Sequence, residues 1–71
     1  MSDLTVVQCR MARAGLGLGV RDLAQLADVS PNTVTRFERG EALQPRTIKS
    51  IKEALENQGI SFLENGGVKV K

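Results

Sequence analysis

The sequence contains no histidine, tryptophan or tyrosine, only two phenylalanines and a single cysteine. Histidine is the commonest acid–base and metal-binding side chain, and no paired carboxylates or activated nucleophile replace it. Too few rings are present for stacking on single-stranded nucleic acid. Cys9 can form no internal disulfide, and the ligands for a structural zinc site are missing. We therefore expect no enzyme, no metal and no cofactor, with Cys9 as a core residue in a cytoplasmic setting.

Long hydrophobic runs are also absent. No apolar stretch approaches the about 20 residues that a membrane-spanning helix needs, and the first residues lack the basic start and apolar segment of a secretory signal. We therefore expect no membrane contact. The chain has 71 residues and a net charge of +2, which predicts one small domain whose partners depend on where the charges lie.

Start and stop signals predict two helices in the first part of the chain. A capping box over Thr5–Gln8 opens a helix over about 6–14, which ends at the glycines that begin with Gly15. A short second helix over 20–27 follows. Asp28 comes next, and Asp is one of the few residue types that tolerate a left-handed turn.

Two further helices begin at prolines. Ser30 is a good N-cap for a helix over about 31–39, and Gly40 closes that helix. Pro45 opens the last helix, over 45–57, whose apolar residues recur every three or four positions. The helical part of the chain is therefore expected to be four helices joined by short connections.

The last dozen residues alternate instead of following a helical period. Segments 60–63 and 68–70 flank Asn65–Gly67, which is a strong turn signal. They predict a short β-hairpin or a pair of short strands. We hypothesise that the last helix and these strands form an isologous dimer interface. The alternative is that the strands cover the chain's own core. The candidate interface residues are Ile60, Phe62, Leu63, Val68 and Val70.

The helices over 20–27 and 31–39, joined by a tight turn, form a helix-turn-helix pattern. Only Val34 and Phe37 of the second helix have core spacing, so its outer face is polar and can enter a groove about 12 Å wide. Asn can bond adenine there and Arg can bond guanine. The pattern alone leaves open whether this face binds DNA or is the solvated face of an interaction module.

The stretch Leu23–Gly40 resembles the lambda-repressor/Cro-like (XRE) helix-turn-helix family. The resemblance rests on Leu23-Ala24, on Asp28-Val29-Ser30 and on Glu38-Arg39-Gly40, and it extends over about residues 5–58. It implies a mainly α, four-helix lambda-repressor-like DNA-binding domain. It also implies a sequence-specific transcriptional regulator of bacterial or phage type that binds double-stranded DNA and controls its own promoter. Because one short recognition helix reads only a few base pairs, we expect a homodimer on a palindromic operator. We expect no small-molecule ligand.

The resemblance also implies roles for single residues. Arg13 and Glu38 match a structural ion pair between the first helix and the end of the third. The recognition helix is Ser30–Arg39, in the major groove. Its base-reading candidates are Pro31, Asn32, Thr35 and Arg36. The phosphate-contacting candidates are Ser30, Thr33, Arg39 and Arg46, joined by Arg21 and Lys49 because these two lie at helix ends or edges.

Two positions depart from the family pattern. Val20 stands where the family usually has a Gln that contacts phosphate, so that Arg21 replaces this contact or the contact is lost. Asp28 stands where the family usually has Gly. The alternative function is an antitoxin or antiactivator-type interaction module acting through the helix over 45–57 and the C-terminal strands. Antitoxins of this family often bind their own operators, so the two functions do not exclude each other.

Overall fold

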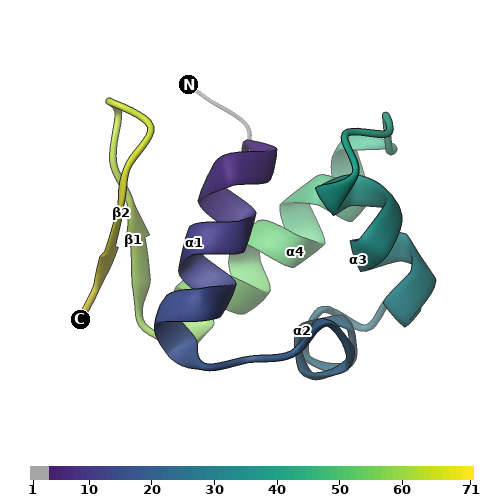
Figure 1. Ribbon diagram of the computed structural model, residues 1–71, viewed down its shortest axis with the longest axis horizontal. Helices are drawn as coiled ribbons and strands as arrows, with labels where there is room; N and C mark the ends of the chain where they lie inside the picture. The colour runs from purple at the N-terminus through teal and green to yellow at the C-terminus, as the bar shows by residue number, and fades with distance from the viewer. Residues whose placement is uncertain (1–3) are drawn as a thin grey trace.

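The computed structural model describes residues 4–71. Its elements follow the order α1 (Val6–Leu16), α2 (Val20–Ala27), α3 (Pro31–Glu38), α4 (Pro45–Asn57), β1 (Ile60–Phe62) and β2 (Val68–Val70). In Figure 1, α1 stands in the middle with α4 behind it, α2 and α3 on one side and the two strands on the other. The fold is mainly α with a short C-terminal hairpin, as the sequence predicts. None of the helices in 4–71 is long and apolar enough to cross a membrane.

Helix α1 begins with the predicted capping box. The Thr5 hydroxyl accepts the Gln8 backbone N–H at 3.0 Å, and the Gln8 side chain accepts the Thr5 backbone N–H at 3.1 Å. The amide nitrogen of Gln8 also donates to the backbone oxygens of Leu63 and Gly67, at 3.5 and 3.4 Å. The residue that caps α1 therefore also connects it to the hairpin loop.

The end of α1 differs from the predicted 6–14. The helix continues to Leu16 and stops at Gly17, which has a left-handed φ of 70°. Gly15 lies inside the helix, although glycine there costs about 1 kcal/mol relative to alanine. A Cβ at Gly15 would lie 3.2 Å from the Val70 Cγ2 atom of β2. This glycine is therefore a point of close approach between helix and strand, and the stop signal belongs to Gly17.

The core draws on all four helices and on β1. Cys9 is fully buried within it, as expected for a small core residue. Half-buried apolar residues such as Val20 pack around the core, so the departure from the family pattern at Val20 serves packing. The buried apolar residues are Leu4, Cys9, Ala12, Leu23, Ala24, Ala27, Val34, Phe37, Ile51, Ala54, Leu55 and Ile60.

The two strands pair with each other within the chain. They are antiparallel, and the first strand ends at Phe62, one residue before the predicted end at 63. Leu63 instead closes the loop, because its backbone N–H donates to the Gly67 oxygen at 3.0 Å and its own oxygen accepts from Gly66 at 3.1 Å. The predicted turn at Asn65–Gly67 therefore lies within a five-residue loop.

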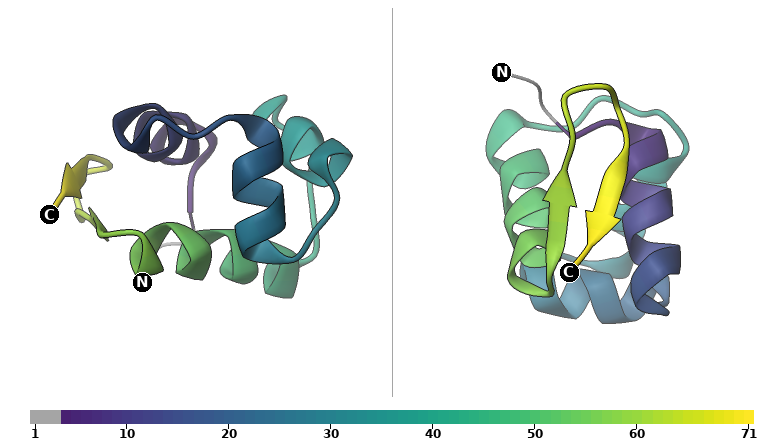
Figure 2. Two further views of the ribbon diagram at one scale, coloured as in Figure 1. Left: turned by 90° about the horizontal axis from the view of Figure 1, so that it is seen from below. Right: turned by 90° about the vertical axis from the view of Figure 1, so that its left-hand side faces the viewer.

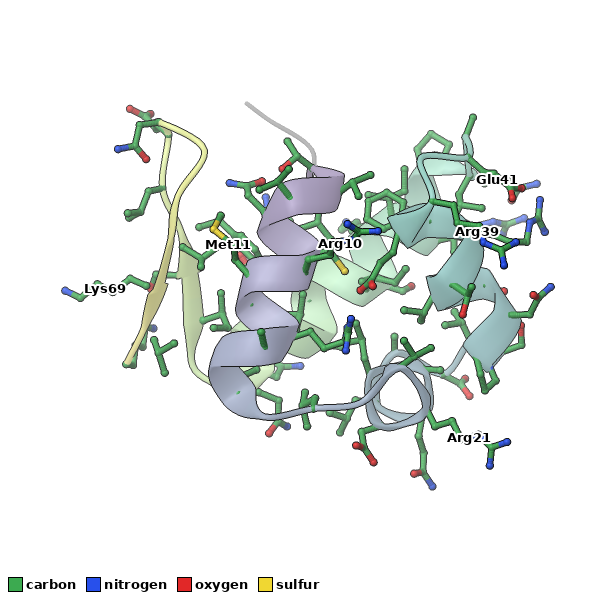
Figure 3. The ribbon with its side chains drawn as sticks, in the orientation of Figure 1. Arg10, Met11, Arg21, Arg39, Glu41 and Lys69 are labelled. Atoms are coloured by element: carbon green, nitrogen blue, oxygen red, sulfur yellow. The ribbon has the colours of Figure 1, made fainter. Side chains whose placement is uncertain are left out.

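The hairpin covers the chain's own helices, with β2 against α1 and β1 against α4 (Figure 2). The register pairs Ile60 with Val70 and Phe62 with Val68. Alternation therefore places these four side chains on one face of the sheet and Lys69 on the other. Figure 3 shows Lys69 pointing away from the helices. The apolar face is thus the inner one.

This arrangement decides which of the predicted interface residues stay exposed. Ile60 is only 2% exposed inside its own chain's core, and Phe62 and Val68 are half-buried against that core. Ile60 is therefore enclosed by its own chain, whereas Phe62 and Val68 keep part of their surface exposed. Leu63 and Val70 remain 40% and 48% exposed. The strands therefore cover the chain's own core, which is the alternative that the sequence left open, and the dimer interface stays a prediction.

Candidate nucleic-acid interface

The turn between α2 and α3 fixes the angle of the two helices. Asp28 adopts the left-handed conformation, with φ 58° and ψ 44°, and its backbone N–H bonds the Gln25 oxygen at 3.3 Å. The Val29 N–H donates to the Ala24 oxygen at 2.9 Å, and the Val29 side chain packs against the core. Aspartate tolerates this conformation, which the family pattern assigns to glycine. The main chain and one apolar contact thus hold the turn.

Helix α3 begins with a hydroxyl cluster. Ser30 Oγ accepts the Thr33 backbone N–H at 3.1 Å and lies 2.8 Å from Thr33 Oγ1. Only one of the two hydroxyl protons is needed for the contact between these oxygens, so the other can be donated to an acceptor. Pro31 occupies the first helical position, where no N–H is needed. The start of α3 therefore presents a hydroxyl donor, which suits a phosphate.

The predicted base-reading residues share the outer face of α3. Val34, Phe37 and Glu38 are buried, which defines the inner face. Pro31 is the only apolar side chain on the outer face, so nothing bulky and apolar obstructs a groove. The outer residues are Pro31, Asn32, Arg36 and Arg39, all exposed, with Thr35 half-buried among them.

Arginines flank this face. Figure 3 shows Arg21 of α2 and Arg39 at the end of α3, both projecting on the side of the molecule away from the hairpin. An open hollow lies between α2 and the start of α3, lined by Arg21, Ala24, Gln25, Val29 and Pro31. The sequence reasoning missed Gln25, which is exposed here. Gln25 lies four residues after Arg21, so both side chains lie on one side of α2. This spacing is the sequence signal that predicts Gln25 as a residue of the same surface.

Two of the predicted phosphate contacts, Arg46 and Lys49, belong to α4. Helix α4 packs against α2 and ends at the hairpin (Figure 2). Arg46 lies in its first turn, and the Arg46 Nε donates to Gln44 Oε1 at 3.3 Å. Lys49 is exposed one turn further along. Both predicted phosphate contacts of α4 are thus exposed, and their contact with DNA stays a prediction.

On the inner side of α3, Arg13 and Glu38 form an ion pair. Arg13 Nε and Nη2 donate to the two Glu38 carboxylate oxygens at 2.8 and 2.9 Å, and Arg13 Nη1 donates to the Leu18 oxygen at 3.1 Å. Arg10 Nη2 donates to the Glu38 backbone oxygen at 2.9 Å. The Glu38 side chain is only 8% exposed. These bonds join α1 to the end of α3 and lie away from the outer face.

Burial and charge act in opposite directions on this carboxylate. Burial alone would raise the pKa of Glu38, but the hydrogen bonds and charge of Arg13 outweigh it and lower the pKa. The neighbouring Cys9 Sγ donates to Glu38 Oε2 at 3.5 Å. Burial and the Glu38 charge raise the pKa of the Cys9 thiol to about 12. The inner cluster is therefore one carboxylate, one guanidinium and one neutral thiol.

A second pair, which the sequence reasoning missed, lies on the outer face. Arg36 Nε donates to Glu41 Oε1 at 2.9 Å, and both side chains are nearly half exposed. Gly40, which precedes Glu41 in the chain, has a left-handed φ of 92°. Such a glycine folds the chain back over the last helical turn. Gly40 therefore predicts the end of the helix and also the return of Glu41 toward Arg36, and the second consequence was missed.

Two helices with a fixed turn, a polar outer face on the second and arginines around it define a helix-turn-helix DNA-binding fold. The chain belongs to the helix-turn-helix domain family, whose sequence model matches residues 7–59. The match spans the helices and ends before β1, in agreement with the resemblance to lambda-repressor/Cro-like domains. No curated protein sequence matches the chain significantly. Family membership indicates a DNA-binding regulator.

Proposed function

We propose that this protein is a sequence-specific transcriptional regulator that places α3 in the major groove of double-stranded DNA. The observation that carries the proposal is the outer face of α3, where Asn32 and Arg36 are exposed and free of apolar neighbours other than Pro31. Asparagine pairs with adenine N6 and N7, and arginine with guanine O6 and N7. Thr35 has a methyl group that suits the thymine methyl.

Phosphate contacts would fix the register of this helix on the duplex. Arg21 and Arg39 flank α3, and Arg46 lies in the first turn of α4. The Ser30–Thr33 hydroxyl pair offers a further donor at the start of α3. Contacts of this kind position a protein without reading sequence and make binding dependent on salt. Ser30, Thr33, Arg21, Arg39, Arg46 and Lys49 are the phosphate contacts of this proposal.

Selection from a library of randomised duplexes, followed by titration of the selected sequence, tests the proposal. Arg36→Ala should weaken binding to the selected duplex by about 5- to 150-fold, the usual worth of one bidentate base contact. Lys69→Ala is the matched control, because it removes one exposed cation from the outer face of the hairpin. Absence of a salt-sensitive specific complex, or an equal loss for both variants, would overturn the proposal.

We further propose that the protein binds a palindromic operator as a homodimer, because one short recognition helix reads only a few base pairs. The exposed apolar side chains at the hairpin end are Val7 and Met11 of α1, with Leu63 and Val70. Figure 3 shows Met11 directed toward the hairpin. A dimer interface at the hairpin end would therefore use Val7, Met11, Leu63 and Val70 in place of the buried Ile60.

Light scattering tests the dimer. Leu63→Asp should shift the protein toward monomer at micromolar concentration, whereas Leu26→Asp, at a similarly exposed position of α2, should not. Point substitutions are preferable to truncation at Gly59, which would remove Ile60 from the core. A wild-type protein that stays monomeric well above micromolar concentration would exclude the dimer.

The antitoxin or antiactivator alternative receives less support from the surface that it would use. Most of the exposed side chains of α4 are charged, and Val70 is the only exposed apolar residue of β1 and β2. A partner docking on α4 would therefore meet mainly ionic groups. The exposed side chains in question are Arg46, Lys49, Glu53 and Glu56.

A further inference from the structure

The main chain fixes where Glu41 lies relative to Arg36. The Glu41 backbone N–H donates to the Arg36 oxygen at 3.1 Å, and the Gly40 N–H donates to the Phe37 oxygen at 2.9 Å. These are the two bonds of a Schellman motif, which the left-handed Gly40 permits. Arg36 and Glu41 are thus joined twice, once by backbone and once by side chains. The carboxylate needs little additional ordering to reach the guanidinium.

The side-chain bond uses one edge of the guanidinium and leaves the rest available. Arg36 donates to Glu41 through Nε at 2.9 Å. An arginine carries five N–H donors in a planar fork, four of them on Nη1 and Nη2. With Nε occupied, the remaining way to bind guanine O6 and N7 with two parallel bonds is end-on, through Nη1 and Nη2. The Arg36–Glu41 pair therefore selects one orientation of the Arg36 guanidinium, the group that would bind the base.

We propose that Glu41 is a positioning residue that holds Arg36 for end-on recognition of a guanine, and so sets the base preference at one position of each half-site. The inference rests on the proposed function of α3 as the reading helix. A flexible arginine can satisfy phosphates or several bases, whereas one with a fixed plane matches guanine best. Glu41 would also disfavour phosphate at this place because like charges repel.

A simpler role for the pair makes a different prediction. Exposed ion pairs contribute little to stability, and a glutamate that merely occupied Arg36 would compete with DNA of every sequence. Its removal would then raise affinity for all duplexes by a similar factor and leave the base preference unchanged. A positioning residue behaves differently, because its removal lowers the preference for guanine at the position that Arg36 reads.

The experiment compares five proteins by selection from randomised duplexes and by competition titration: wild type, Glu41→Gln, Glu41→Ala, Arg36→Ala and Glu64→Gln. Glu41→Gln keeps the shape of the side chain and removes its charge. Glu64→Gln changes the net charge by the same amount in the hairpin loop, at the opposite end of the molecule from α3 (Figure 1). Circular dichroism checks that each variant is folded.

The proposal predicts that Arg36→Ala abolishes one guanine preference of the wild type. At the same position, Glu41→Gln should lower the ratio of affinities for guanine and the next best base by about fivefold or more, the lower end of what a bidentate contact supplies. Binding of Glu41→Gln to unrelated duplexes should be unchanged or tighter. Glu64→Gln should keep the full preference.

Three outcomes would overturn the inference. If Glu41→Gln and also Glu41→Ala, which has no side-chain acceptor for Arg36 Nε, keep the preference that Arg36→Ala loses, Glu41 does not position the Arg36 guanidinium, while the proposed function survives. If Arg36→Ala changes no base preference although the wild type selects a sequence, Arg36 is not a reader. If the wild type selects no sequence, the proposed function fails together with the inference.

Discussion

Helix α3 carries an arginine–glutamate pair on each of its two sides. On the inner side, Glu38 is 8% exposed and accepts two hydrogen bonds from Arg13. On the outer side, Glu41 accepts one bond from Arg36, and the two side chains are 45% and 46% exposed. The same chemistry has different consequences at the two places. A buried pair is costly to break because it leaves an unpaired charge, whereas an exposed pair can exchange with water or DNA.

The largest effect is expected from breaking the inner pair. Glu38→Ala should lower the free energy of unfolding by about 3 kcal/mol, because it leaves the half-buried Arg13 guanidinium and the Cys9 thiol without their acceptor. Urea denaturation measures the loss. Glu41→Ala is the matched control on the same helix end and should change stability by no more than about 0.5 kcal/mol. Equal losses for the two variants would contradict the contrast between the pairs.

A smaller effect is expected at the glycine that shapes the outer pair. Gly40→Ala should cost about 1 kcal/mol, because alanine is strained at φ 92° although nothing lies within 4 Å of its Cβ. Gly66 has φ 91° in the hairpin loop and equally open surroundings, so Gly66→Ala should show a similar loss in urea. Only Gly40→Ala should also reduce the guanine preference. If Gly40→Ala kept the guanine preference, the turn at Gly40 would have no role in base recognition.

The smallest effect is expected from acid. The Glu38 pKa is lower in the folded protein than its ordinary value, so its contribution to stability is complete above the unfolded pKa and is lost as pH falls through the folded pKa. Burial offsets part of the stabilisation by Arg13, which keeps the change small. Urea midpoints should fall more from pH 7 to pH 3 for wild type than for Glu38→Gln. Glu53→Gln, at an exposed site, should follow the wild type.

Local signals in the sequence were sufficient for most of the fold. Helices α2 and α4 span the residues that their caps and prolines indicate, and the Thr5–Gln8 capping box forms as expected. Gly15 misled the prediction because its reason is a contact with Val70, which lies 55 positions later in the chain. A stop signal and a close approach require the same residue type. Only the tertiary structure separates the two.

The candidate site was predictable to the level of a helix face. The spacing of Val34 and Phe37 defined the inner side of α3 and hence the outward side of Asn32 and Arg36. The partner of Arg36 was not found, because a residue beyond the helix end returns to it only through the left-handed Gly40. The inner direction of the strand residues depended on packing against α1 and α4, which periodicity does not specify.

The division of α3 into an inner and an outer side has a consequence for redesign and divergence. The three buried residues that hold the helix in place are not the ones that would meet the bases. Positions 32, 35 and 36 can therefore be rewritten for a new target sequence with little expected cost to folding, since surface changes usually stay within about 0.5 kcal/mol. The same buried framework could therefore support proteins that recognise different DNA sequences, provided that Glu41 changes together with Arg36.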